Sequence, residues 1–423
     1  MWEAVFTVMI TIAATLMVSM FWRNLSSPER RLDYRLKELA VHDETFQQCM
    51  SHLLGPPLVA GNRVKCLVNG DQIFPAMLAA IRAATSTVTF ETYIFWSGEI
   101  GREFTTTLCE RAAAGVKVHL LLDWLGSNKL DANAIADLEC AGVEVERYRP
   151  LRWYNLSRMN SRTHRKLLIV DGRIGFIGGV GIADTWTGNS QSPEHWRDSH
   201  FMLEGPAVAH LQAAFADNWM KTRAEVFNSE EYFPVLKPVG TTVSQVFKSS
   251  PREGGDSARL MFLLSIAAAR QQILIANSYF VPDSHTIAAL VSALERGVAV
   301  EIIVPGEHID TKVTRRASRS LWGPLLRAGV AIYEFQPTMF HCKVMIIDDC
   351  WVSVGSTNFD TRSFRLNDEA NLNSIDHDFA AEQALLFAAD KKRSRQVTLT
   401  DWESRPWQEK LTESVAGLLR SQV

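Results

Sequence analysis

Two segments of the chain carry histidine, lysine and aspartate at one fixed spacing. They read THRKLLIVDGRIGFIGG (163–179) and FHCKVMIIDDCWVSVGSTNFDTRSF (340–364), and both contain the pattern H-x-K-x-x-x-x-D. The residues at the three fixed positions are His164, Lys166 and Asp171 in the first motif, and His341, Lys343 and Asp348 in the second. The residues between lysine and aspartate are apolar and β-prone, so we expect each histidine to lie on a buried strand.

These residue types suit transfer chemistry at a phosphodiester. A neutral imidazole is a competent nucleophile toward phosphorus and forms a covalent phosphohistidine. A second imidazole can protonate the leaving alkoxide and then deprotonate the incoming alcohol. Two lysines supply the positive charge that other phosphoryl enzymes obtain from metal ions. Each motif provides one histidine and one lysine, so the complete set requires both motifs in one site.

Strand geometry separates the aspartates from the other motif residues. Side chains alternate between the faces of a strand, so His164 and Lys166 share one face. Asp171 lies seven residues beyond His164, an odd offset, and Asp171-Gly172 is typical of a hairpin turn. Asp171 and Asp348 complete the candidate catalytic motifs, but this geometry favours a structural role for both.

The segment after the second motif offers hydrogen-bond donors for phosphate. Ser356 and Asn358 are two residues apart on the expected return strand, and both can donate to phosphate oxygens. Ordinary hydrogen bonding at a turn or strand end is the alternative role. The matching positions after the first motif are Gly179 and Gly181, which offer only backbone N–H groups.

Two carboxylates follow the motifs and could orient the imidazole rings. Glu369 in RLNDEANLN could accept from an imidazole N–H and fix its tautomer. Asp198 in HWRDSH is its expected counterpart after the first motif. We therefore add Asp198 and Glu369 to the candidate site as histidine-orienting residues.

The motifs belong to a longer internal repeat of helices and strands. The corresponding segments are 77–95 and 259–282, then 111–123 and 293–306, then 141–148 and 328–335. Strands that alternate with helices predict an α/β fold with mixed, largely parallel sheets flanked by helices. We expect two similar halves, 56–240 and 241–423, related by a pseudo-two-fold, with a shared site where they meet.

The N-terminus predicts a membrane anchor within residues 1–23. Residues 4–22 carry no charge and are long enough to span a bilayer core of about 30 Å. A cleaved signal peptide is the alternative, but Glu3 precedes the apolar run where a basic start would be expected. Arg23, Arg30 and Arg31 follow the span, which favours a cytoplasmic C-terminal part. Residues 24–55 are expected to form a linker with a helix.

Composition argues against two other classes of protein. A net charge of −3 is unlike the basic excess of a dedicated nucleic-acid binder, so we expect no nucleic-acid partner. The six cysteines form no CxxC pair and the eleven histidines form no HExxH pattern, so we expect no metal and no other cofactor. Histidines outside the motifs, including His42 and His377, have no partner in the sequence pattern.

The paired motifs, GSTNFDTRSF and HWRDSHFMLEGPAV resemble the phospholipase D superfamily, and within it the bacterial cardiolipin synthase family. The resemblance covers roughly residues 58–420 and includes the C-terminal RPWQEKLTESVAGLL (405–419). It implies transfer of a phosphatidyl group between phosphatidylglycerol molecules at the bacterial inner membrane, through phosphohistidine and without a metal. It also implies that His164 is the nucleophile and His341 the acid/base.

Three other functions remain open from the sequence. A phospholipase D-type hydrolase would use the same chemistry with water as acceptor. A phosphodiesterase-fold nuclease is disfavoured by the net charge and the apolar N-terminus. A membrane protein of weakened activity is the third, because synthases of this kind often carry Asn where Gly181 stands.

Overall fold

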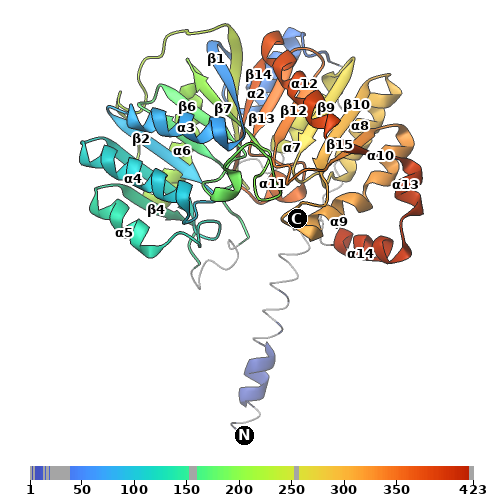
Figure 1. Cartoon of the computed structure of the whole chain (residues 1–423), viewed down its shortest axis with the longest axis horizontal. Coiled ribbons are helices and arrows are strands. Elements are labelled where there is room, and N and C mark those ends of the chain that lie inside the picture. Colours follow the sequence, from blue (N-terminus) through green and yellow to red (C-terminus); the bar gives the residue numbers. More distant parts are fainter. Residues whose placement is uncertain are drawn as a thin grey trace.

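The strand-forming segments of both repeats join in one sheet. The computed structural model describes residues 2, 5–12, 15, 19, 39–151, 160–251 and 257–418. In Figure 1 the strands and helices of the first repeat lie beside those of the second, with the sheet running through both. The strands are β1 Val59–Val68, β2 Thr87–Thr92, β3 Lys117–Asp123, β4 Glu144–Tyr148, β5 Leu167–Val170, β6 Ile174–Gly178, β7 Ser199–Glu204, β8 Thr242–Ser249, β9 Gln272–Asn277, β10 Ala299–Pro305, β11 Ala331–Phe335, β12 Lys343–Ile347, β13 Trp351–Gly355, β14 Glu369–Ile375 and β15 Ser394–Val397.

The strand order is mirrored about the centre of this sheet. It runs β15-β11-β10-β9-β12-β13-β14-β8-β1-β7-β6-β5-β2-β3-β4. The repeats meet where β1 pairs antiparallel with β8, with Val59 opposite Ser244 and an irregularity before Asn62. Gly61 in this irregularity has a φ of +94°, and a Cβ there would lie 2.7 Å from Cβ of Pro238. A residue with a side chain would therefore be strained at this junction.

The expectation of a largely parallel sheet is wrong. Among the described strands of the sheet, parallel pairing is confined to β2-β3-β4 and β9-β10-β11, where helices connect successive strands. The other neighbouring strands of the described sheet run antiparallel, including β5–β6 and β12–β13. Each motif strand returns through a tight turn, and a tight turn can join only antiparallel strands. The mixed sheet with flanking helices is as expected.

Helices cover both faces of the sheet and pack three large hydrophobic cores, with a small fourth cluster at Val281, Ala317 and Ala416. Packing of α6 and α12 against strands of both repeats produces one core that crosses the junction. The opposite face is covered by α3 and α4 in the first repeat, and by α7, α8 and α10 in the second. The helices are α2 Glu44–Leu54, α3 Asn69–Arg82, α4 Glu99–Ala113, α5 Ala132–Cys140, α6 Val208–Arg223, α7 Ser257–Ala268, α8 Ser284–Glu295, α9 Lys312–Ser320, α10 Trp322–Ala328, α11 Thr361–Arg365, α12 His377–Lys392, α13 Leu399–Ser404 and α14 Trp407–Leu418.

Helix α2 packs on the second repeat although it precedes the first in the chain. Phe46 and Met50 are fully buried in the core beneath α7 and α8. The ring of Phe46 meets Trp351 at 5.0 Å between centroids, edge to face. The chain therefore crosses from α2 on the second repeat to β1 at the junction.

The predicted membrane span, residues 4–22, lies only partly within the described residues. Within it, residues 5–12 are helical, and their apolar side chains, such as Phe6 and Met9, are exposed. In the part of the chain that the structure describes, no helix combines the length and apolarity needed to cross a bilayer.

Candidate active site

The two motif histidines lie just before strands β5 and β12, not on them as expected. The backbone N–H of each histidine bonds to a segment of the other repeat. The N–H of His164 donates to the carbonyl of Asp368 at 2.8 Å, and the N–H of His341 donates to the carbonyl of Arg197 at 2.7 Å. Short parallel bridges, Thr163 with Asp368 and Arg197 with Phe340, accompany these bonds. The main chain thus brings the motifs to one junction.

Each imidazole ring contacts a carboxylate that comes from the other repeat. Nδ1 of His164 lies 3.0 Å from both carboxylate oxygens of Glu369, which begins β14 in the second repeat. Nδ1 of His341 lies 2.7 Å from Oδ2 of Asp198, which precedes β7 in the first. A carboxylate at Nδ1 favours the Nδ1–H tautomer and leaves the Nε2 lone pair for a substrate. The sequence predicted both carboxylates but not this crossed pairing.

The two lysines are buried beside the histidines. Nζ of Lys166 donates to the carbonyl of His164 at 2.7 Å, and Nζ of Lys343 donates to the carbonyl of His341 at 2.7 Å. Nζ of Lys343 also donates to Oγ of Ser278 at 2.7 Å. Both lysine side chains are therefore fixed next to the rings, where an anionic substrate would bind.

Burial lowers the pKa values of all four motif bases. It lowers the pKa of His164 to about 4 and that of Lys166 to about 7, and it also lowers the pKa values of His341 and Lys343. Lys343 contributes to the lowered pKa of His164, and Lys166 to that of His341. The motifs thus share one electrostatic environment, in which the imidazole of His164 is neutral near pH 7.

We expect a bell-shaped pH profile for kcat/KM, with both limbs shifted to acid. Activity rises as His164 loses its proton with a pKa near 4, and falls as the acid His341 loses its proton and as Lys166 loses its charge with a pKa near 7. Lys166→Arg keeps its charge, so its basic limb moves to higher pH even where its maximal rate is lower. Lys117→Arg, at an exposed site, is the control; an unmoved basic limb in Lys166→Arg contradicts this assignment.

Ser356 and Asn358 both contact residues that in turn contact motif side chains. Oγ of Ser356 donates to Oε2 of Glu369 at 2.5 Å, so it supports the carboxylate that contacts His164. Oδ1 of Asn358 accepts from Oγ of Ser278 at 2.8 Å, and Ser278 in turn contacts Lys343. The two side chains are therefore part of the hydrogen-bond network of the site.

In the first repeat, Trp186 makes the hydrogen bond to the orienting carboxylate that Ser356 makes in the second. A Cβ at Gly179 would lie 2.6 Å from Oδ1 of Asp198, and one at Gly181 would lie 2.8 Å from Cβ of Ile94 and 3.2 Å from the Trp186 ring. Nε1 of Trp186 donates to Oδ2 of Asp198 at 3.1 Å, as Ser356 does to Glu369. Position 181 is therefore a glycine next to the Trp186 indole, and this indole supports the carboxylate of Asp198.

Trp186→Phe is expected to slow turnover about 10-fold or more, because Asp198 loses one hydrogen bond to a charged group. The change should leave the rate of covalent labelling by a phosphatidyl p-nitrophenyl ester near that of the wild type, since that leaving group needs no proton from His341 and His164 contacts Glu369 instead. Burst and steady-state rates measured on one preparation separate the two steps. Trp407→Phe, at an exposed indole, is the control, and an equal loss in both steps would contradict the prediction.

The motif aspartates bind backbone at the far ends of their strands. The carboxylate of Asp171 accepts from the N–H groups of Thr85, Ser86 and Thr87. Asp348 accepts in the same way from the N–H groups of residues 270, 271 and 272. Both aspartates have φ near +50° in their turns. These contacts support the structural role over the catalytic one.

Sequence reasoning missed several residues of the site. Tyr93 packs edge to face on His164 at 5.4 Å between ring centroids, and Tyr279 does so on His341 at 6.3 Å. These tyrosines occupy the same place in FETYIF and ANSYFV, so the repeat itself carried the signal. Arg197 is buried and contacts both carboxylate oxygens of Asp390, at 3.0 and 2.8 Å. In the sequence, the single arginine of HWRDSH did not indicate a buried ion pair.

Comparison with known proteins first identifies the structural class to which this chain belongs. A family model described as "Cardiolipin synthase, PLD-like domain" matches residues 77–219 and 263–391, one segment in each repeat. The phosphatidylserine synthase of Haemophilus influenzae has a similar fold, with a TM-score of 0.69 over 90% of this chain and 100% of that one, at 13% identity. Polyphosphate kinase from Porphyromonas gingivalis gives a TM-score of 0.52 over 93% of this chain and 58% of its own, at 12% identity. The paired motifs therefore lie in a phospholipase D-like α/β fold.

Sequence relatives narrow the class to one family. Cardiolipin synthase A of Pseudomonas fluorescens is 36% identical over 342 residues, which cover 81% of this chain and 71% of the relative. Cardiolipin synthase A of Pseudomonas putida is 35% identical over 346 residues, 82% of this chain and 72% of the relative. The chain belongs to the cardiolipin synthase family of phospholipase D-like enzymes.

Proposed function

We propose that the enzyme transfers a phosphatidyl group from one phosphatidylglycerol to another, yielding cardiolipin and glycerol. Nε2 of His164 attacks phosphorus, and the glycerol oxygen leaves with the Nε2 proton of His341, which starts the cycle as an imidazolium held by Asp198. A hydroxyl of the second phosphatidylglycerol then attacks the phosphohistidine and gives its proton to His341. Each bond broken at phosphorus is replaced by one formed there, so no cofactor is consumed.

The crossed histidine–carboxylate contacts carry this proposal. Glu369 at Nδ1 of His164 and Asp198 at Nδ1 of His341 turn both Nε2 atoms toward the substrate. Asp198 also stabilises the imidazolium that forms when His341 takes a proton. One ring can thus form the bond to phosphorus while the other handles the proton of the alcohol.

The lysines and the donors around them would hold the phosphate. Lys343 lies 3.3 Å from Nε2 of His341, so its charge stands beside the reacting atom. A bound phosphodiester returns negative charge to the site and favours the protonated lysines. We place Asn358 with them as a phosphate-binding residue, because it lies one hydrogen-bonded contact from Lys343.

We also propose the wider arrangement that such substrates require. Residues 1–23 would anchor the protein in the bacterial inner membrane and 24–55 would link the anchor to the catalytic part, which would lie in the cytoplasm. The catalytic part would comprise halves 56–240 and 241–423, related by a pseudo-two-fold. The mirrored strand order and the family match in each repeat support this division.

Lipid profiling in a cardiolipin-deficient host tests the function. Wild-type protein should restore cardiolipin, and His164→Ala should not. A gain of phosphatidic acid without cardiolipin would instead identify water as the acceptor and the protein as a hydrolase. Synthesis by the purified protein should persist in EDTA, because the proposed steps use only side chains. Loss of synthesis in EDTA by protein whose Tm is unchanged would contradict the mechanism.

A further inference from the structure

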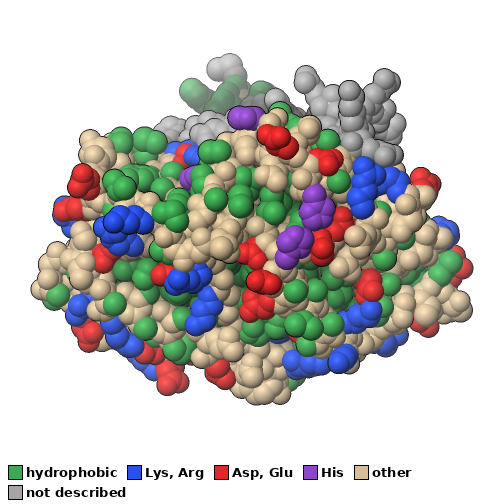
Figure 2. Space-filling view, turned by 90° about the horizontal axis from the view of Figure 1, so that it is seen from above, with side chains coloured by type: hydrophobic (Ala, Val, Ile, Leu, Met, Phe, Trp, Pro, Cys, Tyr) green, Lys and Arg blue, Asp and Glu red, His purple; other side chains and the backbone are tan. Residues whose placement is uncertain are grey.

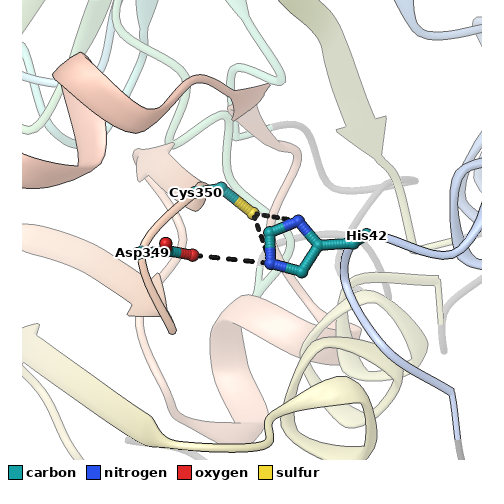
Figure 3. Close-up of side chains that lie close together, drawn as sticks. All are labelled: His42, Asp349 and Cys350. Carbon is teal, nitrogen blue, oxygen red and sulfur yellow. Dashed lines mark hydrogen bonds and ion pairs between the residues drawn. The ribbon is translucent and has the colours of Figure 1, made fainter.

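A second group of ligand-type side chains lies outside the phosphodiester site. Nε2 of His42 is 3.5 Å from Oδ1 of Asp349 and 3.9 Å from Sγ of Cys350, and Nδ1 of the same ring is 3.6 Å from that sulfur. In Figure 3 the imidazole faces both the carboxylate and the thiol. One ligand atom from each residue lies within 4.8 Å of the others. No other such group of histidine, cysteine and acidic side chains occurs among the described residues.

Two separate parts of the fold create this group. Asp349 and Cys350 form the turn between β12 and β13, and Asp348 fixes that turn through its bonds to residues 270–272. His42 lies in the turn just before α2, which Phe46 holds against the second repeat. Backbone contacts therefore fix the segments on both sides, with the Cys350 side chain buried and those of His42 and Asp349 exposed.

His377, at the start of α12, lies against the group. Its ring stacks on His42 at 5.8 Å between centroids. Its Nδ1 lies 3.0 Å from the carbonyl oxygen of Asp349 and 3.4 Å from Oδ2 of the same residue. Figure 2 shows histidine side chains beside acidic ones on this exposed face. His377 can therefore orient the Asp349 carboxylate, as hydrogen-bonded neighbours of metal ligands do.

We propose that His42, Asp349 and Cys350 bind a divalent transition metal of the zinc class, with His377 positioning Asp349. Imidazole, carboxylate and thiolate are the ligands that such ions take, and three protein ligands leave one position for water. Metal–ligand bonds of about 2.0–2.3 Å in a tetrahedron place ligand atoms roughly 3.3–3.8 Å apart. The separations of 3.5 and 3.9 Å from Nε2 of His42 are close to this range.

The proposed ion would have a structural role. It would join the segment before α2 to the β12–β13 turn of the second repeat, whose strand β12 begins at Lys343. The thiol of Cys350 would release its proton to water on binding. The sequence prediction of no metal rested on local spacing, and these ligands are separated by 307 and 308 positions, so no local pattern revealed them.

Cobalt binding to the full-length protein tests the proposal. Apo protein titrated with Co²⁺ should bind one ion per chain and develop a thiolate-to-cobalt charge-transfer band with tetrahedral ligand-field bands. Cys350→Ser and His42→Ala should lose both signals. His377→Ala should keep the band but bind Co²⁺ about 10-fold more weakly. Cys49→Ser and His52→Ala, on the same helix α2, are matched controls and should behave as the wild type.

The outcomes separate this site from the phosphodiester site. Zn²⁺ should displace Co²⁺ and raise the Tm of the wild type but not of Cys350→Ser. His164→Ala should bind Co²⁺ normally, whether or not lipid profiling supports cardiolipin synthesis. Absence of the charge-transfer band in the wild type, or its persistence in Cys350→Ser, would overturn the proposal.

Discussion

We expect His164→Ala to abolish the covalent phosphatidyl-enzyme and to lower overall transfer by more than the roughly 10²–10⁴-fold expected for loss of a general acid/base alone. The ring removed is the proposed nucleophile, and water or another side chain cannot form the same intermediate. His341→Ala keeps the nucleophile, so slow labelling by a phosphatidyl donor should still occur. Acid-quenched labelling with a radiolabelled donor, followed by mass spectrometry of the modified peptide, measures both effects.

Two further variants make this result specific. His52→Ala changes an exposed histidine on α2 and should label and turn over as the wild type. The labelled peptide should contain His164. Labelling that survives in His164→Ala and disappears in His341→Ala would reverse the two roles, without changing the proposed overall reaction.

Glu369→Gln and Asp198→Asn are expected to affect opposite steps. Glu369 contacts the nucleophile His164, so Glu369→Gln should slow covalent labelling by up to about 10⁴-fold, the loss seen when an orienting carboxylate becomes an amide. Asp198 contacts His341, so Asp198→Asn should leave labelling by a phosphatidyl p-nitrophenyl ester, whose leaving group needs no proton, closer to normal and slow transfer to the acceptor. Single-turnover labelling followed by a chase with acceptor lipid measures each step.

The crossed pairing makes this prediction distinct from one based on sequence position. If each carboxylate served the motif of its own repeat, Asp198→Asn would slow labelling and Glu369→Gln would slow the chase. That result would contradict the geometry. Glu403→Gln, at an exposed position on α13, is the control for a change of the same chemical type.

Local patterns predicted the elements of the fold but not their assembly. Helix–strand alternation gave β2, β3, β9 and β10 in nearly the observed positions, because buried parallel strands read as apolar runs. The same patterns did not show that β1 and β8 would pair across the repeats, because the sequence of a strand does not specify which strand will pair with it. The position of α2 on the second repeat depends on long-range packing of Phe46 and was equally hidden.

The same distinction applies to the site. The motif spacing predicted His164 and His341, and the repeat placed Asp198 and Glu369 at matching points. Which ring each carboxylate contacts depends on backbone bridges between the repeats, which no local pattern encodes. The role of Trp186 was hidden for another reason, because its indole reaches Asp198 from a different segment than the serine that contacts Glu369.

The reciprocal contacts between the repeats limit how the two parts of the gene can diverge. A substitution at position 369 alters a ring encoded some two hundred codons upstream, and one at position 198 alters a ring encoded downstream. Neither part can therefore drift alone or be exchanged for a foreign counterpart without a compensating change in the other. Chimaeras cut between β7 and β8 should inherit activity only when both carboxylates arrive with geometry matched to the opposite ring.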